Sequence, residues 1–132
     1  MSYRLTPEEI ETIETYDAFA PTWNWVNPPH WKDNHWYAYV SRIKGNRVLD
    51  LGCGTARDAA TFFLEEWEEF HYTGIDISLG MLTVAHRQFQ SAIDAGRVAL
   101  MQMSMYELAF KSGSFDAFFS TAALMHIPRE RI

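Results

Sequence analysis

The sequence of 132 residues is poor in cysteine and has no apolar run of the length that crosses a membrane. Cys53 is its single cysteine, so no disulfide can form within the chain, which fits the reducing environment of the cytoplasm. Residues 1–6 hold no apolar core of the kind found in secretory signals. These absences predict a cytoplasmic protein without a membrane partner.

Positive charge is scarce as well, since 11 lysine and arginine residues stand against 17 aspartates and glutamates and give a formal net charge of −6. This balance excludes a broad basic surface for nucleic acid, although a local basic patch is compatible with it, and it favours a small-molecule substrate. His30 and His35 are five residues apart, a spacing that does not bring two metal ligands onto one helical face, so we predict no metal site. The chain is instead rich in apolar residues (48%) and aromatic residues (15%), which predicts one domain with a sizeable core.

The stretch at 47–58, RVLDLGCGTARD, is the part around which the rest of the chain is organised. Its first apolar residues predict a strand, and Gly52 and Gly54 predict a turn at which a ligand can approach the backbone. Thr55 is a typical helix cap, and the acid three residues later strengthens that signal, so we expect a helix to start here. A strand, a glycine turn and a helix start together present free N–H groups to a ligand. The stretch therefore predicts a cofactor site, with a purely structural turn as the alternative.

Two kinds of cofactor compete for this loop. A dinucleotide site requires a small residue at the end of G-x-G-x-x-G, and here that position holds Arg57, which is large and charged. What stands instead is Gly52-x-Gly54-x-Ala56, preceded by Asp50. This resembles motif I of the class I S-adenosylmethionine-dependent methyltransferases, D-x-G-x-G-x-G, with alanine in place of the third glycine. The resemblance implies cofactor contacts from Asp50, Gly52, Cys53, Gly54, Thr55 and Arg57, although a surface salt bridge would explain Arg57 equally well.

The segment at 71–78 predicts a second strand that carries Asp76 near its carboxyl end and is followed by a helix cap. In a βαβ unit, an acid at this place reaches the ribose hydroxyls of a nucleoside cofactor. The letters GIDIS at 74–78 resemble the next motif of the same family, G-x-D-x-S, and the letters ML and A that follow resemble its M-L-x-x-A. Two motifs in the expected order favour a cofactor site over a structural turn. The resemblance adds contacts from Asp76, Ile77 and Met81.

A helix is expected at 78–95, and a third strand at 97–103. The letters SMYELAF at 104–110 then resemble the family segment D-x-x-x-L-P-F. In the family, the acid accepts a hydrogen bond from the adenine amino group. Ser104 stands in its place, and a hydroxyl accepts such a bond without the charge that strengthens it. The resemblance implies contacts from Ser104 and Met105.

A fourth strand is predicted at 114–121, where SFDAFFST resembles the family motif S-F-D-x-V-x-S. The letters LMHIP at 124–128 resemble the L-H-H-V-P that follows it in relatives. The resemblance places Ser120 beside the methionine part of the cofactor and lets His126 face the substrate. His126 is the one candidate for a catalytic role, with ordinary packing as the alternative, and the catalytic group is otherwise unknown.

The N-terminal part predicts helical structure. Thr6, followed by a proline and two acids, marks a helix start, and Pro21 ends the helix. The letters YDAFAPTW at 16–23 resemble the Y-D-x-x-A-x-x-Y opening of many small-molecule methyltransferases, in which the tyrosine helps to close over the cofactor. The resemblance therefore implies a contact from Tyr16, and ordinary packing of an amphipathic helix is the alternative.

The alternation of strands and helices predicts the α/β class, as a Rossmann-like parallel sheet with helices on both faces. A second helix at 31–44 is expected to join the first in an N-terminal helical cap over 1–45, before a cofactor-binding core over 46–132 in the same single domain. The resemblance implies the class I strand order 3-2-1-4-5-7-6. Only four strands can be counted here, so the chain is expected to be truncated after the fourth strand, as a fragment or as a natural short form.

The function that the resemblance implies is S-adenosylmethionine-dependent methyl transfer to an unidentified, small-molecule acceptor, by in-line attack on the sulfonium methyl carbon. S-adenosylhomocysteine would be the product. A module that binds these compounds without catalysis and a degenerate interaction protein are the alternatives.

The fourth strand also predicts a partner. It is apolar on both faces, as an interior strand should be: the apolar residues are Phe115, Ala117, Phe118 and Phe119. Left at an edge, such a strand offers unpaired N–H and C=O groups to another chain, so we expect a homodimer through this edge.

Overall fold

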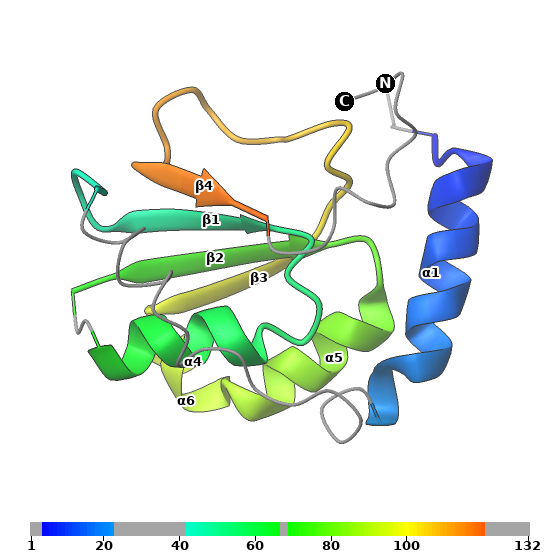
Figure 1. Ribbon diagram of the computed structural model, residues 1–132, viewed down its shortest axis with the longest axis horizontal. Coiled ribbons are helices and arrows are strands. Elements are labelled where there is room, and N and C mark those ends of the chain that lie inside the picture. Colours follow the sequence, from blue (N-terminus) through cyan, green and yellow to red (C-terminus); the bar gives the residue numbers. More distant parts are fainter. Residues whose placement is uncertain (1–3, 23–41, 67–68, 121–132) are drawn as a thin grey trace.

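A computed structural model describes residues 4–22, 42–66 and 69–120, and the elements below are those of these residues. Its four parallel strands form one sheet, in which β1 (Arg47–Leu51) lies between β2 (His71–Asp76) and β4 (Ala117–Phe119), with β3 (Val98–Gln102) beyond β2. The order β3-β2-β1-β4 is the predicted one, and Figure 1 shows the four strands side by side. The predicted α/β fold with a parallel sheet is confirmed.

The helical segments of the described residues are α1 (Pro7–Phe19), η1 (Ala20–Thr22), α4 (Arg57–Glu66), α5 (Leu79–Gln88) and α6 (Gln90–Asp94). In Figure 1, α4, α5 and α6 lie along one side of the sheet, and α1 stands beside α5, across one end of the strands. None of these helices is both long enough and apolar enough to cross a membrane. The predicted helix at 31–44 lies mostly outside the described residues.

Two predicted helix caps are confirmed, and one predicted helix is wrong in extent. Thr6 caps α1 and Ser78 caps α5, because each side-chain oxygen accepts a hydrogen bond from a backbone N–H of the first turn. The helix expected at 78–95 is broken at Phe89, where the backbone leaves helical geometry (φ −109°, ψ 23°). The Phe89 side chain is buried in the core, and this burial fixes the turn between α5 and α6.

The glycine turn runs one residue further than predicted. The predicted cap at Thr55 is wrong, because α4 begins only at Arg57 and Ala56 precedes it. Ala56 adopts a left-handed backbone (φ 59°), and its N–H donates to the carbonyl oxygen of Cys53 (2.9 Å between N and O). A left-handed backbone costs an alanine about 1–2 kcal/mol, whereas glycine adopts it freely. The alanine in the third glycine position of the motif thus keeps a glycine-like conformation.

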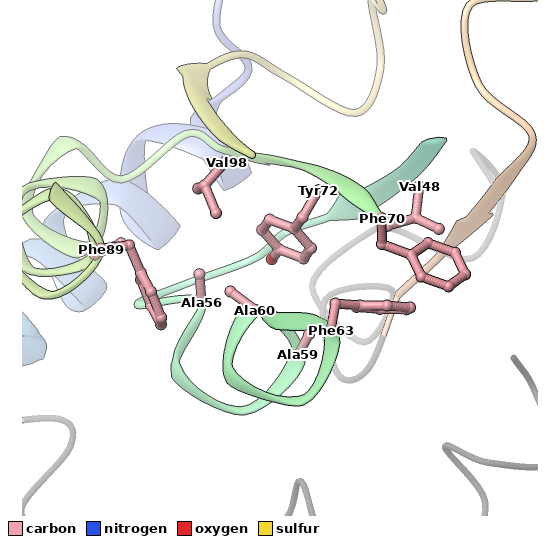
Figure 2. Close-up of a cluster of buried hydrophobic side chains, with 10 residues drawn as sticks. Val48, Ala56, Ala59, Ala60, Phe63, Phe70, Tyr72, Phe89 and Val98 are labelled. Atoms are coloured by element: carbon pink, nitrogen blue, oxygen red, sulfur yellow. The ribbon is translucent and has the colours of Figure 1, made fainter. Parts of the chain in front are cut away.

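The hydrophobic core fills the space between the sheet and helices α4 and α5, and Figure 2 shows its centre. Phe63, on α4, is 1% exposed. Its ring centroid lies 5.0 Å from that of Phe70 and 5.9 Å from that of Phe119. Tyr72 and Val48 come from the two central strands and are also buried. The core therefore holds α4 against the sheet directly behind the glycine turn.

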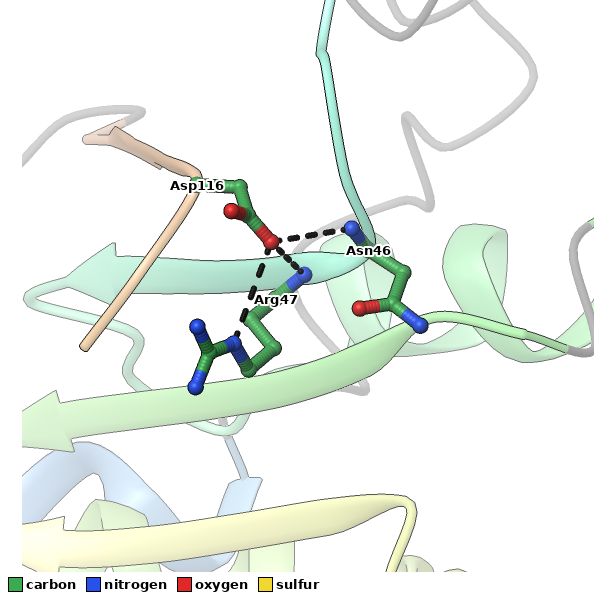
Figure 3. A network of polar contacts seen from close by, with 3 residues as sticks. All are labelled: Asn46, Arg47 and Asp116. Carbon is green, nitrogen blue, oxygen red and sulfur yellow. Dashed lines mark hydrogen bonds and ion pairs between the residues drawn. The ribbon is translucent and has the colours of Figure 1, made fainter. Parts of the chain in front are cut away.

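The fourth strand is shorter than predicted, since 114–121 was expected and only 117–119 is extended. Its start is fixed by Asp116, whose carboxylate accepts hydrogen bonds from the backbone N–H groups of Asn46 (3.0 Å) and Arg47 (2.9 Å) at the start of β1, as Figure 3 shows. A Cβ at Gly45 would lie 2.3 Å from the Asp116 carboxyl carbon, so this contact requires glycine there. Within the described residues β4 has one neighbour, β1, and the Phe118 side chain is 69% exposed.

Phe63→Ala tests the core behind the turn. The substitution leaves a cavity among the packed rings, and we expect the free energy of unfolding to fall by about 3–5 kcal/mol. Phe19→Ala is the matched control, because Phe19 is 55% exposed at the end of α1, and it should change the free energy of unfolding by about 0.5 kcal/mol or less. Denaturant unfolding measures both values. Equal losses in the two variants would show that Phe63 does not occupy a packed core.

Candidate functional site

Three strand ends meet at one edge of the sheet, next to the glycine turn. The N–H of Cys53 donates to the carbonyl oxygen of Ile75 (2.9 Å), and the N–H of Met103 donates to that of Asp76 (3.1 Å). These bonds join the turn after β1 to the end of β2, and the end of β2 to the segment after β3. Ligands of open α/β sheets bind outside the carboxyl ends of the strands, so this edge is the candidate site.

Asp76 lies at the centre of this edge. One carboxylate oxygen, Oδ2, accepts a hydrogen bond from the N–H of Gly54 (2.8 Å), and the other, Oδ1, accepts one from the N–H of Ser78 (2.8 Å). Burial raises the pKa of Asp76, while these backbone donors act to lower it. A single carboxylate thus connects the glycine turn to the first turn of α5.

The glycine turn has an open face and a packed face. A Cβ built on Gly54 (φ 58°) would meet no atom within 4 Å, so the turn is open at this residue. A Cβ on Gly74 would lie 2.7 Å from the Sγ of Cys53, so the Cys53 side chain packs tightly on β2. Burial raises the pKa of the Cys53 thiol well above its usual value and keeps the sulfur neutral. Of the loop residues predicted to contact a cofactor, Gly54 offers open backbone, and Cys53 has its side chain turned to β2.

Asp50 lies in the interior, below the turn. Its side chain is 2% exposed, and its Oδ2 accepts a hydrogen bond from the hydroxyl of Tyr72. Burial raises the pKa of Asp50 to about 7; the bond from Tyr72 lowers it in part, and the charge of Asp76 raises it further. Nothing in the sequence pattern points to Tyr72 as the partner. The other oxygen of Asp50, which was predicted as a cofactor contact, is buried and has no hydrogen-bond partner among the described residues.

Helix α1 is attached to the same edge through Asp17. The Asp17 Oδ1 accepts hydrogen bonds from the hydroxyl of Ser78 (2.6 Å) and from the N–H of Gly80 (2.8 Å). A Cβ at Gly80 would lie 2.9 Å from this oxygen, so the close approach requires glycine. Tyr16 is half-buried beside Asp17, and burial, together with the charge of Asp76, raises the pKa of its hydroxyl. The structure thus brings Tyr16 within electrostatic range of Asp76, and its contact with a cofactor stays a prediction.

Ser104 is buried just beyond the end of β3 and is bonded to a residue of α1 to which no sequence motif relates it. Its hydroxyl donates to the Oε1 of Glu9, on α1, and accepts a hydrogen bond from the N–H of Tyr106 (3.1 Å). Glu9 is 6% exposed. The capping-box pattern locates Glu9 at the start of a helix, but it carries no information about a contact with position 104.

The remaining predicted site residues are spread around this edge. Met81 is fully buried on the inner side of α5, and the carbonyl oxygen of Ile77 accepts a hydrogen bond from the Gln102 side chain (3.2 Å). Thr55 is buried in the turn. The other residues predicted to contact the cofactor are half-buried: Gly52, Arg57, Met105 and Ser120. His126 lies outside the described residues, and among the residues that are described no three His, Cys, Asp or Glu side chains are grouped to hold a metal ion.

Comparison with known proteins gives a family and a fold. The methyltransferase domain family matches residues 48–132. The O-methyltransferase rstn1 of Aspergillus nomiae is 32% identical over 92 residues, which cover 70% of this chain and 40% of that protein. The chain spans well under half the length of the curated relatives it matches.

Solved structures agree with the sheet described above. An N-methyltransferase of Haemonchus contortus, in complex with phosphomonomethylethanolamine and S-adenosylhomocysteine, superposes with a TM-score of 0.68 at 28% identity, over 95% of this chain and 31% of that chain. The [4+2]-cyclase SpnF superposes with a TM-score of 0.66 at 20% identity, over 87% of this chain and 50% of that chain. The Rossmann-like fold is therefore confirmed by proteins of different activities.

Asp50→Asn tests the buried carboxyl. Because the pKa of Asp50 is about 7 in the folded chain and 3.8 in its ordinary state, the folded chain holds a proton that the unfolded chain releases. The free energy of unfolding should therefore fall as the pH rises from about 4 to about 7, with an Asp50 contribution of up to about 4 kcal/mol. This fall should be smaller in Asp50→Asn and unchanged in Asp94→Asn, a control at an exposed position on α6. Denaturant unfolding across the pH window gives the slopes, and equal slopes for all three proteins would contradict the prediction.

Proposed function

The chain belongs to the methyltransferase domain family, and we propose that it binds S-adenosylmethionine at the edge described above and transfers the methyl group to a small-molecule acceptor. The observation that carries the proposal is the placement of Asp76, with its carboxylate fixed between the Gly54 and Ser78 N–H groups at the end of β2. A carboxylate accepts more bonds than these two, and the ribose hydroxyls of a nucleoside are suitable donors.

The residues of the edge fit such a nucleoside. Asp76 would hold the ribose, and the open backbone at Gly54 would let the cofactor lie against the turn. Helix α1, attached by Asp17, would cover the bound compound and exclude water, and residues 1–45 would act as a cap on the core at 46–132. When bound, S-adenosylmethionine supplies a methyl group on a positively charged sulfur, which is already an activated leaving group. The task of the chain is then to orient the acceptor in line with that methyl group.

Two side chains near the site are unsuited to act as a base or a nucleophile. The pKa of the Tyr16 hydroxyl and that of the Cys53 thiol are both raised, so both groups keep their protons at neutral pH. Tyr16 would therefore close the site and donate hydrogen bonds to the ligand. The group that activates the acceptor stays unassigned, and His126 remains a prediction from the sequence. The acidic balance of the chain (net charge −6) supports a small-molecule acceptor over nucleic acid.

A module that binds the cofactor without catalysis is the second candidate. The likeness to SpnF, a cyclase, shows that the fold alone does not determine the reaction, so the fold does not decide between methyl transfer and binding without catalysis. Calorimetric titration with S-adenosylmethionine and with S-adenosylhomocysteine is the decisive first experiment. Binding of both compounds supports the proposal, and methyl transfer in the presence of candidate acceptors then separates an enzyme from a binding module. A folded chain that binds neither compound would instead be an interaction protein that has lost the cofactor.

A homodimer through β4 is part of the proposal. Within the described residues β4 pairs with β1 alone, and the Phe118 side chain on this short strand is 69% exposed, so a second copy could pair along the other edge of β4.

Asp76→Ala tests the ribose contact. Loss of a charged acceptor should weaken binding of S-adenosylhomocysteine by about 1.5–3 kcal/mol in calorimetric titration. Asp94→Ala, at an exposed position on α6, is the control and should bind as the wild type does. A variant at Asp76 that unfolds like the wild type and keeps its affinity would remove Asp76 from the site.

Phe118→Lys tests the dimer. A lysine at this edge places like charges opposite each other across a two-fold axis, so light scattering at micromolar protein concentration should show a dimer for the wild type and a monomer for the variant. Leu108→Lys is the control, because Leu108 is 46% exposed but lies outside β4, and it should leave the dimer intact. A monomeric wild type at this concentration would reject the homodimer.

A further inference from the structure

Helix α1 has little apolar burial to hold it on the core. Of its 13 residues, all of which the structure describes, Glu9 alone is buried, while the side chains of Ile10 and Phe19 are 45% and 55% exposed. Burial of an apolar face is what usually fixes a helix on a core. Polar contacts therefore carry much of the attachment of α1, and near its carboxyl end they come from Asp17.

The hydrogen bonds of Asp17 converge on a single oxygen. Its Oδ1 accepts from the hydroxyl of Ser78 (2.6 Å) and from the N–H of Gly80 (2.8 Å). A Cβ at Gly80 would lie 2.9 Å from this oxygen and 3.0 Å from the Asp17 Cα, so α1 approaches α5 as closely as a glycine permits. The carboxylate lies at the start of α5, where the helix dipole favours a negative charge.

Ser78 is the residue through which this contact reaches the candidate site. Its hydroxyl has one proton, and the bond to Asp17 fixes the direction in which that proton points. The same oxygen accepts from the N–H of Met81 (3.1 Å) and so holds the first turn of α5. The backbone N–H of Ser78 donates to the Oδ1 of Asp76 (2.8 Å). Three bonds on one serine thus connect α1, the start of α5 and the carboxylate at the end of β2.

The two carboxylates also act on each other through their charges. Burial is the main cause of the raised pKa of Asp76, and the charge of Asp17 adds to the rise. Ser78 offsets this repulsion, because its O–H binds one carboxylate while its N–H binds the other. A shift of Asp17 would therefore act on Asp76 in two ways, through the serine and through the distance between like charges.

We propose that Asp17 is a positioning residue for the cofactor: through Ser78 it sets the direction in which Asp76 offers its free lone pairs to the ribose hydroxyls. The inference rests on the proposed function, since it concerns the same carboxylate. It also has a converse, because a coupling between two contacts acts equally in both directions. A bound ribose strengthens the attachment of α1, so the helix is held most firmly when a nucleoside is in place.

Two substitutions of Asp17 separate its position from its charge. Asp17→Ala removes the acceptor and should weaken binding of S-adenosylhomocysteine about 10-fold in calorimetric titration. Asp17→Asn removes the charge but keeps one oxygen, and because both hydrogen bonds converge on one oxygen, this variant should bind within about 3-fold of the wild type. Glu14→Ala is the matched control: it removes an exposed acid one turn earlier on the same helix and should bind as the wild type does.

A ligand without ribose hydroxyls separates positioning of Asp76 from mere coverage of the site. The analogue of S-adenosylhomocysteine that lacks both hydroxyls cannot bond to Asp76, so the wild type should bind it about 10-fold or more weakly than the parent compound. Asp17→Ala should bind this analogue as the wild type does, because the contact that the substitution weakens is absent from both complexes. Loss of a cover would instead weaken binding of both ligands by the same factor.

Gly80→Ala reaches the same contact from α5. Its added Cβ would displace the Asp17 carboxylate, whereas alanine itself is favoured within a helix, so the fold of α5 is not at risk. This variant should lose affinity for S-adenosylhomocysteine as Asp17→Ala does and should keep the wild-type affinity for the analogue. Denaturant unfolding confirms that each variant used in the comparison is folded.

The outcomes divide as follows. A wild type that binds no S-adenosylhomocysteine, or that binds both ligands equally, rejects the proposed ribose contact and this inference with it. Alanine variants that lose affinity for the hydroxyl-bearing ligand alone support the inference. Wild-type affinity in folded Asp17→Ala and Gly80→Ala rejects Asp17 as a positioning residue while the proposed function stands. Equal weakening for both ligands, or an Asp17→Asn as weak as Asp17→Ala, also rejects it, since coverage or charge would then account for the effect.

Discussion

The two hydrogen bonds that Asp76 accepts are the contacts on which the rest of the site depends. They join the Gly54 N–H of the glycine turn to the Ser78 N–H at the start of α5, so one side chain sets the spacing between two loops that come from different strands. The backbone donors also oppose the rise in pKa that burial causes, which favours the ionised form. Ser78 in turn donates to Asp17, and that bond brings α1 to the same edge. Asp76 at the end of β2 thus links the turn to the start of α5 and, through Ser78, to the N-terminal helix.

The sequence patterns predicted the parts of the fold that depend on local order. The caps at Thr6 and Ser78 and the place of Asp76 follow from cap chemistry and from motifs whose spacing is short, and the strand order follows from the resemblance to the class I family. The errors lie where tertiary packing outweighs a local preference. Phe89 breaks a helix because its ring is buried in the core, and Ala56 takes a left-handed conformation that the propensity of alanine disfavours.

Contacts between distant residues were beyond the reach of pattern analysis. Tyr72 on Asp50 and Glu9 on Ser104 join side chains whose meeting depends on how the sheet and α1 come together. No alternation or spacing rule relates the members of such a pair. Asp17 was within the quoted Y-D motif, yet its partners, the Ser78 hydroxyl and the Gly80 N–H, could be assigned only from the structure. The motifs thus located the site, and the structure supplied the contacts that hold it in shape.

Cys53 makes the glycine turn accessible to thiol chemistry. Its sulfur occupies the space above Gly74 in which any larger residue would place a Cβ, so the side chain packs on β2 although the residue is only half-buried. The raised pKa keeps the sulfur in its unreactive protonated form while the turn is closed. Since it is the single cysteine of the chain, the rate of alkylation would report on this one loop, without any engineered label. A ligand bound against the Gly54 backbone would slow that rate. Cys53, at the variable position between the two glycines of the motif, would therefore serve as a natural probe of this loop.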